Sequence, residues 1–161
     1  MAIKIVGVLL VLGALAAIVL AMQAPAPVPG SVLPTAVVTI GKAIVQVEIA
    51  STPAQRAQGL SGRATICGAP LRQGCGEAQK GMLFVFQKPT QDGFWMKDMH
   101  FALDIIWVDS GGEVVTIAPN LSPETYPKSF YPRAPALMVL EVPAGFAAAY
   151  GIAIGDKVVV K

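Results

Sequence analysis

The sequence predicts a mainly β fold, a β-sandwich or small distorted barrel with two short helices, preceded by an N-terminal transmembrane or signal helix. First, short apolar or alternating segments follow one another between Gly- and Pro-containing turns, which is typical of β-sandwiches and barrels. Second, only two short segments after residue 32 carry helix signals. Third, the chain begins with a long apolar run.

That apolar run extends from Ile5 to Met22, contains no charge, and follows Lys4. It is long enough to cross most of a hydrocarbon core of roughly 30 Å, and the preceding positive charge favours a cytoplasmic N-terminus. We therefore expect a signal anchor or signal peptide at 1–23, a proline-rich linker at 24–31 and a single β domain at 32–161. The domain is then exported. It is anchored in the inner membrane facing the periplasm or cell exterior, or secreted if the segment is cleaved.

The strands of the domain follow from their alternation and from the turns between them. Gly41-Lys42 is a two-residue hairpin turn, and Asp109-Ser110-Gly111-Gly112 closes a second hairpin. The strand after Gly41-Lys42 alternates apolar and polar residues, which indicates an antiparallel strand with one wet face. Strands are expected at 36–40, 43–50, 82–86, 94–96, 103–109, 113–118, 137–142 and 157–161.

The two helices are recognised by their ends. Thr52 is placed as an N-cap, Pro53 as the first helical residue and Gln55 as the capping-box partner, with Gly59 ending the helix. The second helix is expected at 144–150. The proline-rich segment 119–135 is too long for a simple connector, so we expect it to fold over one face as a binding loop or lid.

Composition limits the function classes. The chain is 54% hydrophobic, and after Lys4 it has 11 basic and 10 acidic side chains, a formal charge of +1. Because no basic run with interleaved aromatics is present, nucleic acid is excluded as the main partner. The two cysteines, Cys67 and Cys75, are expected to form a disulfide outside the cytoplasm. With one histidine and no C-x-x-C spacing, neither a metal nor a cofactor is predicted.

Six motifs follow one another in a fixed order between about Thr39 and Val160. They are Arg56-x-x-Gly59-Leu60-x-x-Arg63, Gly81-Met82-Leu83-Phe84-Val85-Phe86, Phe94-Trp95-Met96-Lys97, Leu103-Asp104-Ile105-Ile106, Leu140-Glu141-Val142-x-Ala144-Gly145 and Gly151-Ile152-x-x-Gly155-Asp156. Together they resemble the family called domain of unknown function 192. This resemblance implies a compact, mostly β domain, often exported, with no established activity. Two departures are Asp98-Met99, where the family more usually has Asn-Thr, and the insertion from Cys67 to Cys75.

Asp104 is the strongest candidate for a functional or structural charge. It lies in a predicted strand whose two faces are both mostly apolar, so its carboxylate is expected to be shielded from water. A buried carboxylate needs a partner. We expect a cation, with Arg56, Arg63 and Lys97 as candidates. One interpretation is a fixed ion pair that holds the first helix on the sheet; the other is the floor of a binding site.

The functional interpretation combines this carboxylate with an aromatic wall. A ring platform beside charged groups can stack on one face of a sugar and hydrogen-bond its hydroxyls. The sequence therefore predicts a binding or accessory module for a polar envelope ligand, possibly a saccharide. The candidate ligand-binding residues are Arg56, Arg63, Trp95, Lys97, Asp98, Asp104, Tyr126 and Tyr131.

Two alternative functions stay open. The first is a hydrolase that uses Asp104, Asp98 and His100, although no Gly-x-Ser-x-Gly elbow is present. The second is a structural partner-binding domain without a small-molecule site, which would present an exposed apolar patch.

The two tryptophans also have a structural interpretation. Core packing is the ordinary interpretation of Trp107, and for Trp95 it is as favoured as a role in binding.

Overall fold

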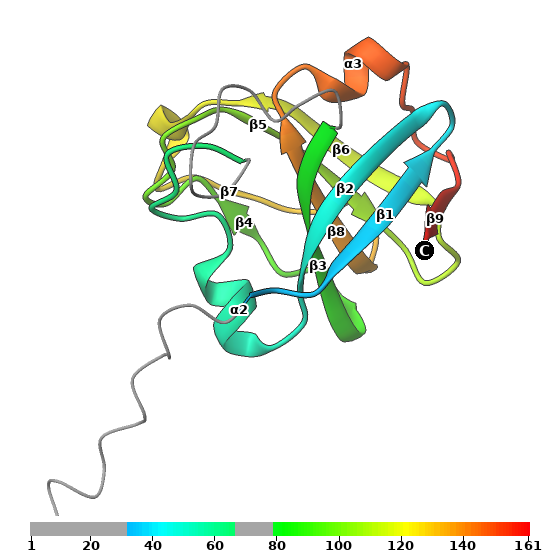
Figure 1. Ribbon diagram of the computed structural model, residues 1–161, viewed down its shortest axis with the longest axis horizontal. Coiled ribbons are helices and arrows are strands. Elements are labelled where there is room, and N and C mark those ends of the chain that lie inside the picture. Colours follow the sequence, from blue (N-terminus) through cyan, green and yellow to red (C-terminus); the bar gives the residue numbers. More distant parts are fainter. Residues whose placement is uncertain (1–31, 67–78) are drawn as a thin grey trace, which may run out of the picture. The chain divides into compact units, whose positions relative to one another are not determined.

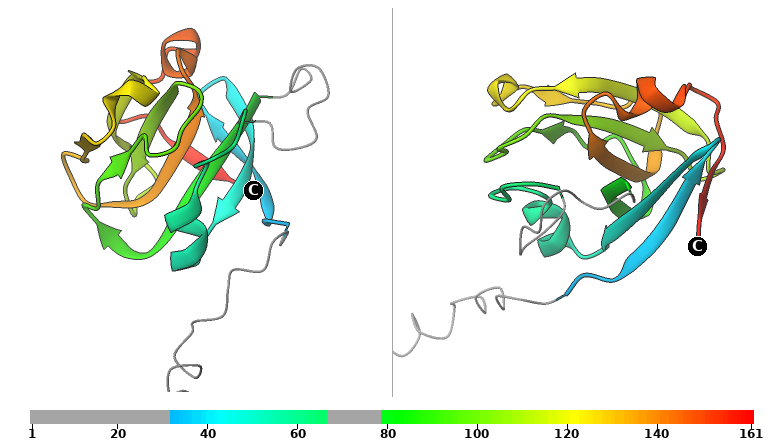
Figure 2. Two further views of the ribbon diagram at one scale, coloured as in Figure 1. Left: turned by 90° about the vertical axis from the view of Figure 1, so that its left-hand side faces the viewer. Right: turned by 45° about the horizontal axis from the view of Figure 1, so that its top comes forward.

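The computed structural model describes residues 32–66 and 79–161, which form one mainly β unit (Figure 1). The sheet curls into a half-barrel, as the two further views show (Figure 2). The elements in the described residues are β1 (Thr35–Ile40), β2 (Ala43–Ala50), α2 (Pro53–Gln58), β3 (Gln79–Thr90), β4 (Phe94–Trp95), β5 (Leu103–Val108), β6 (Val114–Leu121), the 3-10 helix η1 (Pro123–Thr125), β7 (Ser129–Phe130), β8 (Ala136–Pro143), α3 (Phe146–Tyr150) and β9 (Val158–Val160).

Within the described ranges, seven strands form the main sheet in the order β6-β5-β8-β3-β2-β1-β9. Its strand pairs are antiparallel except β2 with β3, which are parallel and are joined through α2 and the segment after it. The expected hairpins β1–β2 and β5–β6 are confirmed. An isolated bridge between Glu113 and Lys157 links the ends of the sheet. The strands therefore approach a barrel, and the fold is one curled sheet instead of two packed sheets.

Both faces of the central strands are covered, so the sheet has two apolar clusters. Along β3, Leu83 belongs to one cluster, and Met82 and Phe84 to the other, because neighbouring residues of a strand point to opposite faces. The first cluster includes Phe146 and Ala147 of α3. The second includes Leu60, next to α2, and packs against Phe94 and Phe130 of the separate β4–β7 ribbon. The second face is the one that carries the candidate site.

The first helix folds as predicted, whereas the proline-rich segment differs from the expected binding loop or lid. Thr52 caps α2 with the full capping box to Gln55. The segment 119–135 is more regular than a lid, because it contains the end of β6, the 3-10 helix and β7, which pairs with β4. This pairing fixes the ribbon over the second apolar cluster.

Several predictions fall outside the described residues. These are the anchor or signal peptide at 1–23, the linker at 24–31, and the disulfide between Cys67 and Cys75. Within residues 32–66 and 79–161, no helix is long and apolar enough to cross a membrane.

Candidate functional site

Asp104 lies on β5 and is fully buried, as the sequence predicts. Its partners differ from the prediction. One carboxylate oxygen accepts hydrogen bonds from the backbone N–H groups of Asn120 (2.8 Å) and Gly145 (3.0 Å), and the other accepts one from Ala147 (2.8 Å). No arginine or lysine of the described residues forms an ion pair with it.

The expected cation is therefore replaced by three backbone donors. This solution is physically sufficient because hydrogen bonds to a charged acceptor are strong and satisfy its lone pairs. Asp104 ties the end of β6, through Asn120, to the N-terminal end of α3, through Gly145 and Ala147. Asn120 and Gly145 both have positive φ, 54° and 83°. The carboxylate therefore stabilises the irregular end of β6 and the N-cap of α3 at once. Its role is structural.

Glu141 lies on β8, on the opposite face of the sheet from Asp104. It aligns with Met82 of β3 on one side and Ile105 of β5 on the other, and Met82 aligns in turn with Glu48 of β2. The backbone of Glu141 runs so close to Gly81 that a Cβ there would lie 2.7 Å from the Glu141 carbonyl oxygen. Glycine at position 81 thus permits the close approach of β3 and β8 below the carboxyl group.

The carboxyl group of Glu141 is buried without adequate hydrogen bonding. The residue is only 5% exposed, and within the described part of the chain its Oε2 has no hydrogen-bond partner. Burial raises the pKa of Glu141 to about 8, against a smaller opposing effect of the nearby Arg63. At neutral pH the group is therefore mostly a neutral acid, which has one O–H to donate.

Glu141 borders a cavity of about 390 Å³ between α2, β3 and the β4 strand. A volume near the lower end of the range for ligand pockets suits a small molecule. Two of the eight predicted binding residues, Arg56 and Trp95, line it. The lining residues are Pro53, Arg56, Ala57, Gln58, Gly59, Leu60, Ser61, Phe84, Phe86, Asp92, Gly93, Phe94, Trp95, Met99 and Glu141.

The aromatic wall of this cavity is built from packed rings. Phe94 stands edge-on to Phe84 with ring centroids 5.0 Å apart, and it also contacts Phe86 at 6.5 Å. On its other side Phe94 meets the buried Trp107 at 5.9 Å. Edge-to-face contacts of this kind hold rings in fixed positions. The wall is thus anchored in the core, which also confirms the interpretation of Trp107 as core.

Arg56 is held at the edge of the cavity by α2. Its Nη1 donates to the carbonyl oxygens of Ser51 and Val85, the latter at 3.0 Å. The guanidinium lies over the ring of Phe86, 4.9 Å from its centroid, a cation–π contact. The short capped helix therefore presents a positive charge in a fixed place.

Arg63 forms a bidentate ion pair with Glu48, with N···O distances of 2.8 and 2.7 Å. The hydrogen bonds to Glu48 raise the pKa of Arg63, so the guanidinium stays charged. Arg63 does not line the cavity, but its charge acts on Glu141. It lowers the pKa of Glu141 from outside the cavity lining.

The β4–β7 ribbon carries the remaining predicted aromatics. Trp95 is 54% exposed, and its ring centroid lies 6.3 Å from that of Tyr126, which is 46% exposed. The ring of Tyr131 lies against Gly93, where a Cβ would come within 2.6 Å of it. Both tyrosines therefore contact residues that line the cavity, at its outer side.

Lys97, Asp98 and His100 lie on an exposed turn and do not line the cavity. The turn is attached to the residues after α2, since Gly62 N–H donates to the Asp98 carbonyl and the Ser61 hydroxyl to the Lys97 carbonyl. No group of three or more metal-ligating side chains occurs among the described residues. Because both Asp104 oxygens bind backbone amides, the predicted set of Asp104, Asp98 and His100 does not form a common site.

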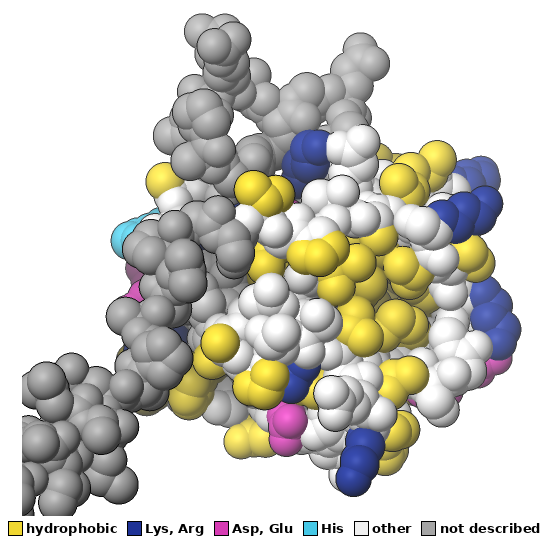
Figure 3. Space-filling model, turned by 60° about the horizontal axis from the view of Figure 1, so that its bottom comes forward, with side chains coloured by type: hydrophobic (Ala, Val, Ile, Leu, Met, Phe, Trp, Pro, Cys, Tyr) yellow, Lys and Arg dark blue, Asp and Glu magenta, His cyan; other side chains and the backbone are white. Residues whose placement is uncertain are grey.

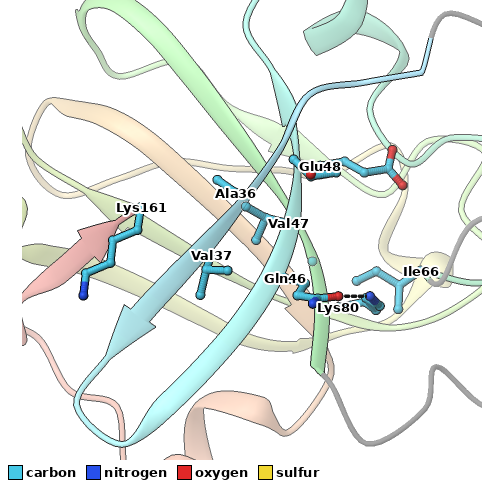
Figure 4. Close-up of a pocket in the computed structure, with 10 residues that line it drawn as sticks. Ala36, Val37, Gln46, Val47, Glu48, Ile66, Lys80 and Lys161 are labelled. Carbon is cyan, nitrogen blue, oxygen red and sulfur yellow. Dashed lines mark hydrogen bonds between the residues drawn. The ribbon is translucent and has the colours of Figure 1, made fainter.

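A second cavity of about 400 Å³ lies against β1, β2 and β3, and its lining is shown in Figure 4. Its principal polar groups already have partners: Lys80 donates to the side chain of Gln46, and Glu48 is paired with Arg63. The cavity bordered by Glu141 is the better candidate because it combines an aromatic wall with a buried carboxyl oxygen that lacks a partner.

Apolar side chains are also exposed elsewhere. Ile44, Ile154, Val159 and Val160 are among the exposed large hydrophobic residues. Figure 3 shows a face on which hydrophobic side chains gather in a hollowed patch, with Lys and Arg side chains near its edge. A contiguous apolar patch of this kind suits contact with another protein.

Glu141 is not among the candidate residues predicted from the sequence, although it belongs to the motif Leu140-Glu141-Val142. The sequence signal for it is the same as for Asp104, a single charge inside an apolar strand.

The comparisons with known proteins find one family and similar solved structures. The model of domain of unknown function 192, described as "Uncharacterized ACR", matches residues 36–160. A structure of a protein of unknown function from Novosphingobium aromaticivorans DSM 12444 is 34% identical, with a TM-score of 0.68, covering 86% of this chain and 94% of that chain. A structure from Sinorhizobium meliloti 1021, described as a "putative transcription regulator", is 28% identical, with a TM-score of 0.67, covering 81% and 98%. No curated protein matches.

Proposed function

The chain belongs to the domain of unknown function 192 family, and for this member we propose that the domain binds a small polar ligand, a saccharide, in the Glu141 cavity. In this proposal the protein is an extracytoplasmic binding or accessory module for an envelope component, tethered by the apolar segment 5–22. The single observation that carries the proposal is the buried Glu141 carboxyl group at the border of an aromatic cavity.

A buried polar atom without a partner costs free energy, commonly about 1–3 kcal/mol. Among the described residues, polar side-chain atoms in this condition are Trp107 Nε1 and Glu141 Oε2. Of these two residues, only Glu141 lines the cavity. A ligand that hydrogen-bonds the carboxyl group would remove this unfavourable contribution. The folded protein is thus expected to be more stable when a ligand occupies the cavity.

The surrounding groups favour a ring with polar substituents. Trp95 is half-exposed at the cavity, next to Tyr126, and an aromatic face in this position can stack on the apolar face of a sugar. Arg56 and Asp92 provide a donor and an acceptor for hydroxyl groups. The combination of a stacking surface with a few polar groups is that of a ligand site.

The proposal is tested by a ligand screen on the full-length protein. Each compound in a panel of neutral and amino sugars is added, and the melting temperature is followed. We expect at least one sugar to raise the melting temperature of the wild type. The same sugar should leave the melting temperature of Trp95→Ala unchanged. The matched control is Tyr150→Ala, which removes an exposed aromatic on α3, next to the other apolar cluster. If no sugar binds, or if both variants lose binding equally, the proposal is wrong.

A partner-binding function is the second candidate, supported by the apolar patch in Figure 3. It predicts that ligand binding is absent while the protein is retained by a partner. The same Trp95→Ala variant distinguishes the two functions, since removing a ring at the cavity would leave a partner surface elsewhere intact.

A further inference from the structure

We propose that the Glu141 cavity takes an acetamido group, so that the ligand is an N-acetylated amino sugar and not a plain hexose. This inference rests on the proposed function and makes its ligand class specific. It follows from the chemistry of the lining, which is mostly apolar but contains one buried hydrogen-bonding group.

The apolar side chains of the lining favour contact with an apolar group of the ligand. Leu60 and Phe84 are buried side chains of the second apolar cluster, and Phe94 and Met99 pack against it. A plain hexose would turn hydroxyl groups toward these side chains, and an unpaired hydroxyl in an apolar place is unfavourable. The methyl of an acetamido group would bury apolar area there instead.

The buried carboxyl group requires a hydrogen-bond acceptor. As a neutral acid, Glu141 has an O–H to donate, and an amide carbonyl oxygen is a strong acceptor. In a trans acetamido group the N–H points away from the carbonyl oxygen. Asp92, an exposed residue of the lining, would be available as a carboxylate acceptor for this N–H. The acetamido group would thus offer an acceptor to the Glu141 carboxyl group and a donor to Asp92.

The charged groups around Glu141 are Arg63 and Glu48, which form the bidentate pair, and Arg56 and Asp92, which line the cavity. The hydrogen bonds to Glu48 raise the pKa of Arg63, so this guanidinium stays charged. The donor on Glu141 is lost when the carboxyl group ionises, near pH 8. Binding should therefore weaken as the pH rises through this value.

The test is an NMR titration of the full-length protein with N-acetylglucosamine and, separately, with glucose, at pH 6.5 and pH 9. At pH 6.5 we expect N-acetylglucosamine to bind about tenfold more tightly than glucose, the scale of one good hydrogen bond. Between pH 6.5 and pH 9 its affinity should fall about tenfold, as the neutral fraction of Glu141 falls.

The Glu141→Gln variant sharpens the test, because its amide keeps a donor that cannot ionise. We expect it to bind N-acetylglucosamine at pH 6.5 within about threefold of the wild type and to show no loss at pH 9. Glu124→Gln, on the exposed 3-10 helix, is the control and should keep the pH dependence of the wild type.

The outcomes separate the two proposals. If glucose binds as tightly as N-acetylglucosamine, the acetamido assignment is wrong and saccharide binding stands. If the Gln variant loses affinity with pH as the wild type does, Glu141 is not the donor and the assignment also fails. If neither sugar binds, the acetamido inference is wrong, and it is overturned together with the saccharide proposal if no other sugar of the panel binds either.

Discussion

The sheet buries two carboxyl groups, Asp104 on β5 and Glu141 on β8, and it treats them in opposite ways. Asp104 faces the α3 side and accepts three backbone hydrogen bonds. Glu141 faces the α2 side, borders a cavity and has an oxygen without a partner among the described residues. Burial alone therefore does not distinguish a structural charge from a functional one. The distinction lies in whether the fold satisfies the group.

The two environments also differ in what a substitution removes. At Asp104, loss of the carboxylate leaves backbone N–H groups buried without acceptors, which destabilises the folded state. At Glu141, replacement by a neutral isostere removes an ionisable group whose burial destabilises the folded state. The comparison thus predicts opposite signs for the two changes in stability.

Asp104→Ala is expected to have the largest effect. It removes three charge-assisted hydrogen bonds, and at about 1.5 kcal/mol each this lowers the free energy of unfolding by about 4–5 kcal/mol. Asp104→Asn keeps one acceptor oxygen and should lose roughly half as much. Chemical denaturation measures both. A loss below about 1 kcal/mol for the Ala variant would contradict the structural role.

Glu141→Gln is expected to stabilise the protein in a pH-dependent way. Since the folded pKa, about 8, lies above the ordinary value of 4.5, the folded protein retains a proton between these values that the unfolded chain has released. Wild-type stability therefore falls as the pH rises from about 4.5 to about 8 and then levels off. The variant lacks this fall.

The advantage of the Gln variant should be absent at pH 4 and reach about 3 kcal/mol at pH 7, at about 1.4 kcal/mol for each pH unit. Denaturation curves at pH 4, 7 and 9 measure it. Equal stability of the variant and the wild type at all three values would show that Glu141 ionises normally.

Arg63→Gln should have a smaller effect on stability and a specific effect on Glu141. The ion pair with Glu48 is partly exposed, so its loss is expected to cost about 1 kcal/mol. Because the Arg63 charge lowers the pKa of Glu141, its removal should raise that pKa above about 8. Lys157→Gln breaks the exposed pair with Glu113 and is the control that leaves Glu141 unchanged. A lower pKa of Glu141 in the Arg63 variant would contradict this arrangement.

Trp95→Ala should change stability least, by under about 1 kcal/mol, because the side chain is half-exposed and lies on the two-stranded ribbon. Its effect is expected on ligand binding. Thermal denaturation without ligand measures the stability, and a collapse of the fold would place Trp95 in the core instead of at the cavity.

Local features of the fold were predictable, whereas the partners of the buried charges were not. The capping box at Thr52 and the hairpin at Gly41-Lys42 depend on neighbouring residues, and both are present as predicted. The burial of Asp104 also followed from its apolar neighbours. Its partners lie 16 to 43 residues away in the chain, and no local pattern could reveal that β6 and the N-terminal end of α3 present their amides there.

The position of Glu141 in the candidate site could likewise not be predicted from the sequence. Its place beside the cavity depends on the register of β8 against β3 and β5, and on α2 and the ribbon covering that face. A charge inside the apolar segment 137–142 signalled a buried carboxyl group. Only the pairing of the strands distinguishes a group satisfied by backbone amides from one that borders a cavity.

The most direct test of the difference between the two carboxyl groups is the titration of Glu141 in the full-length protein. Carbon-13 NMR of the side-chain carboxyl, assigned by its disappearance in Glu141→Gln, gives the midpoint. We predict a pKa of about 8, with the signal moving when a sugar fills the cavity. A midpoint near the ordinary value of 4.5, unchanged by any ligand, would contradict the account.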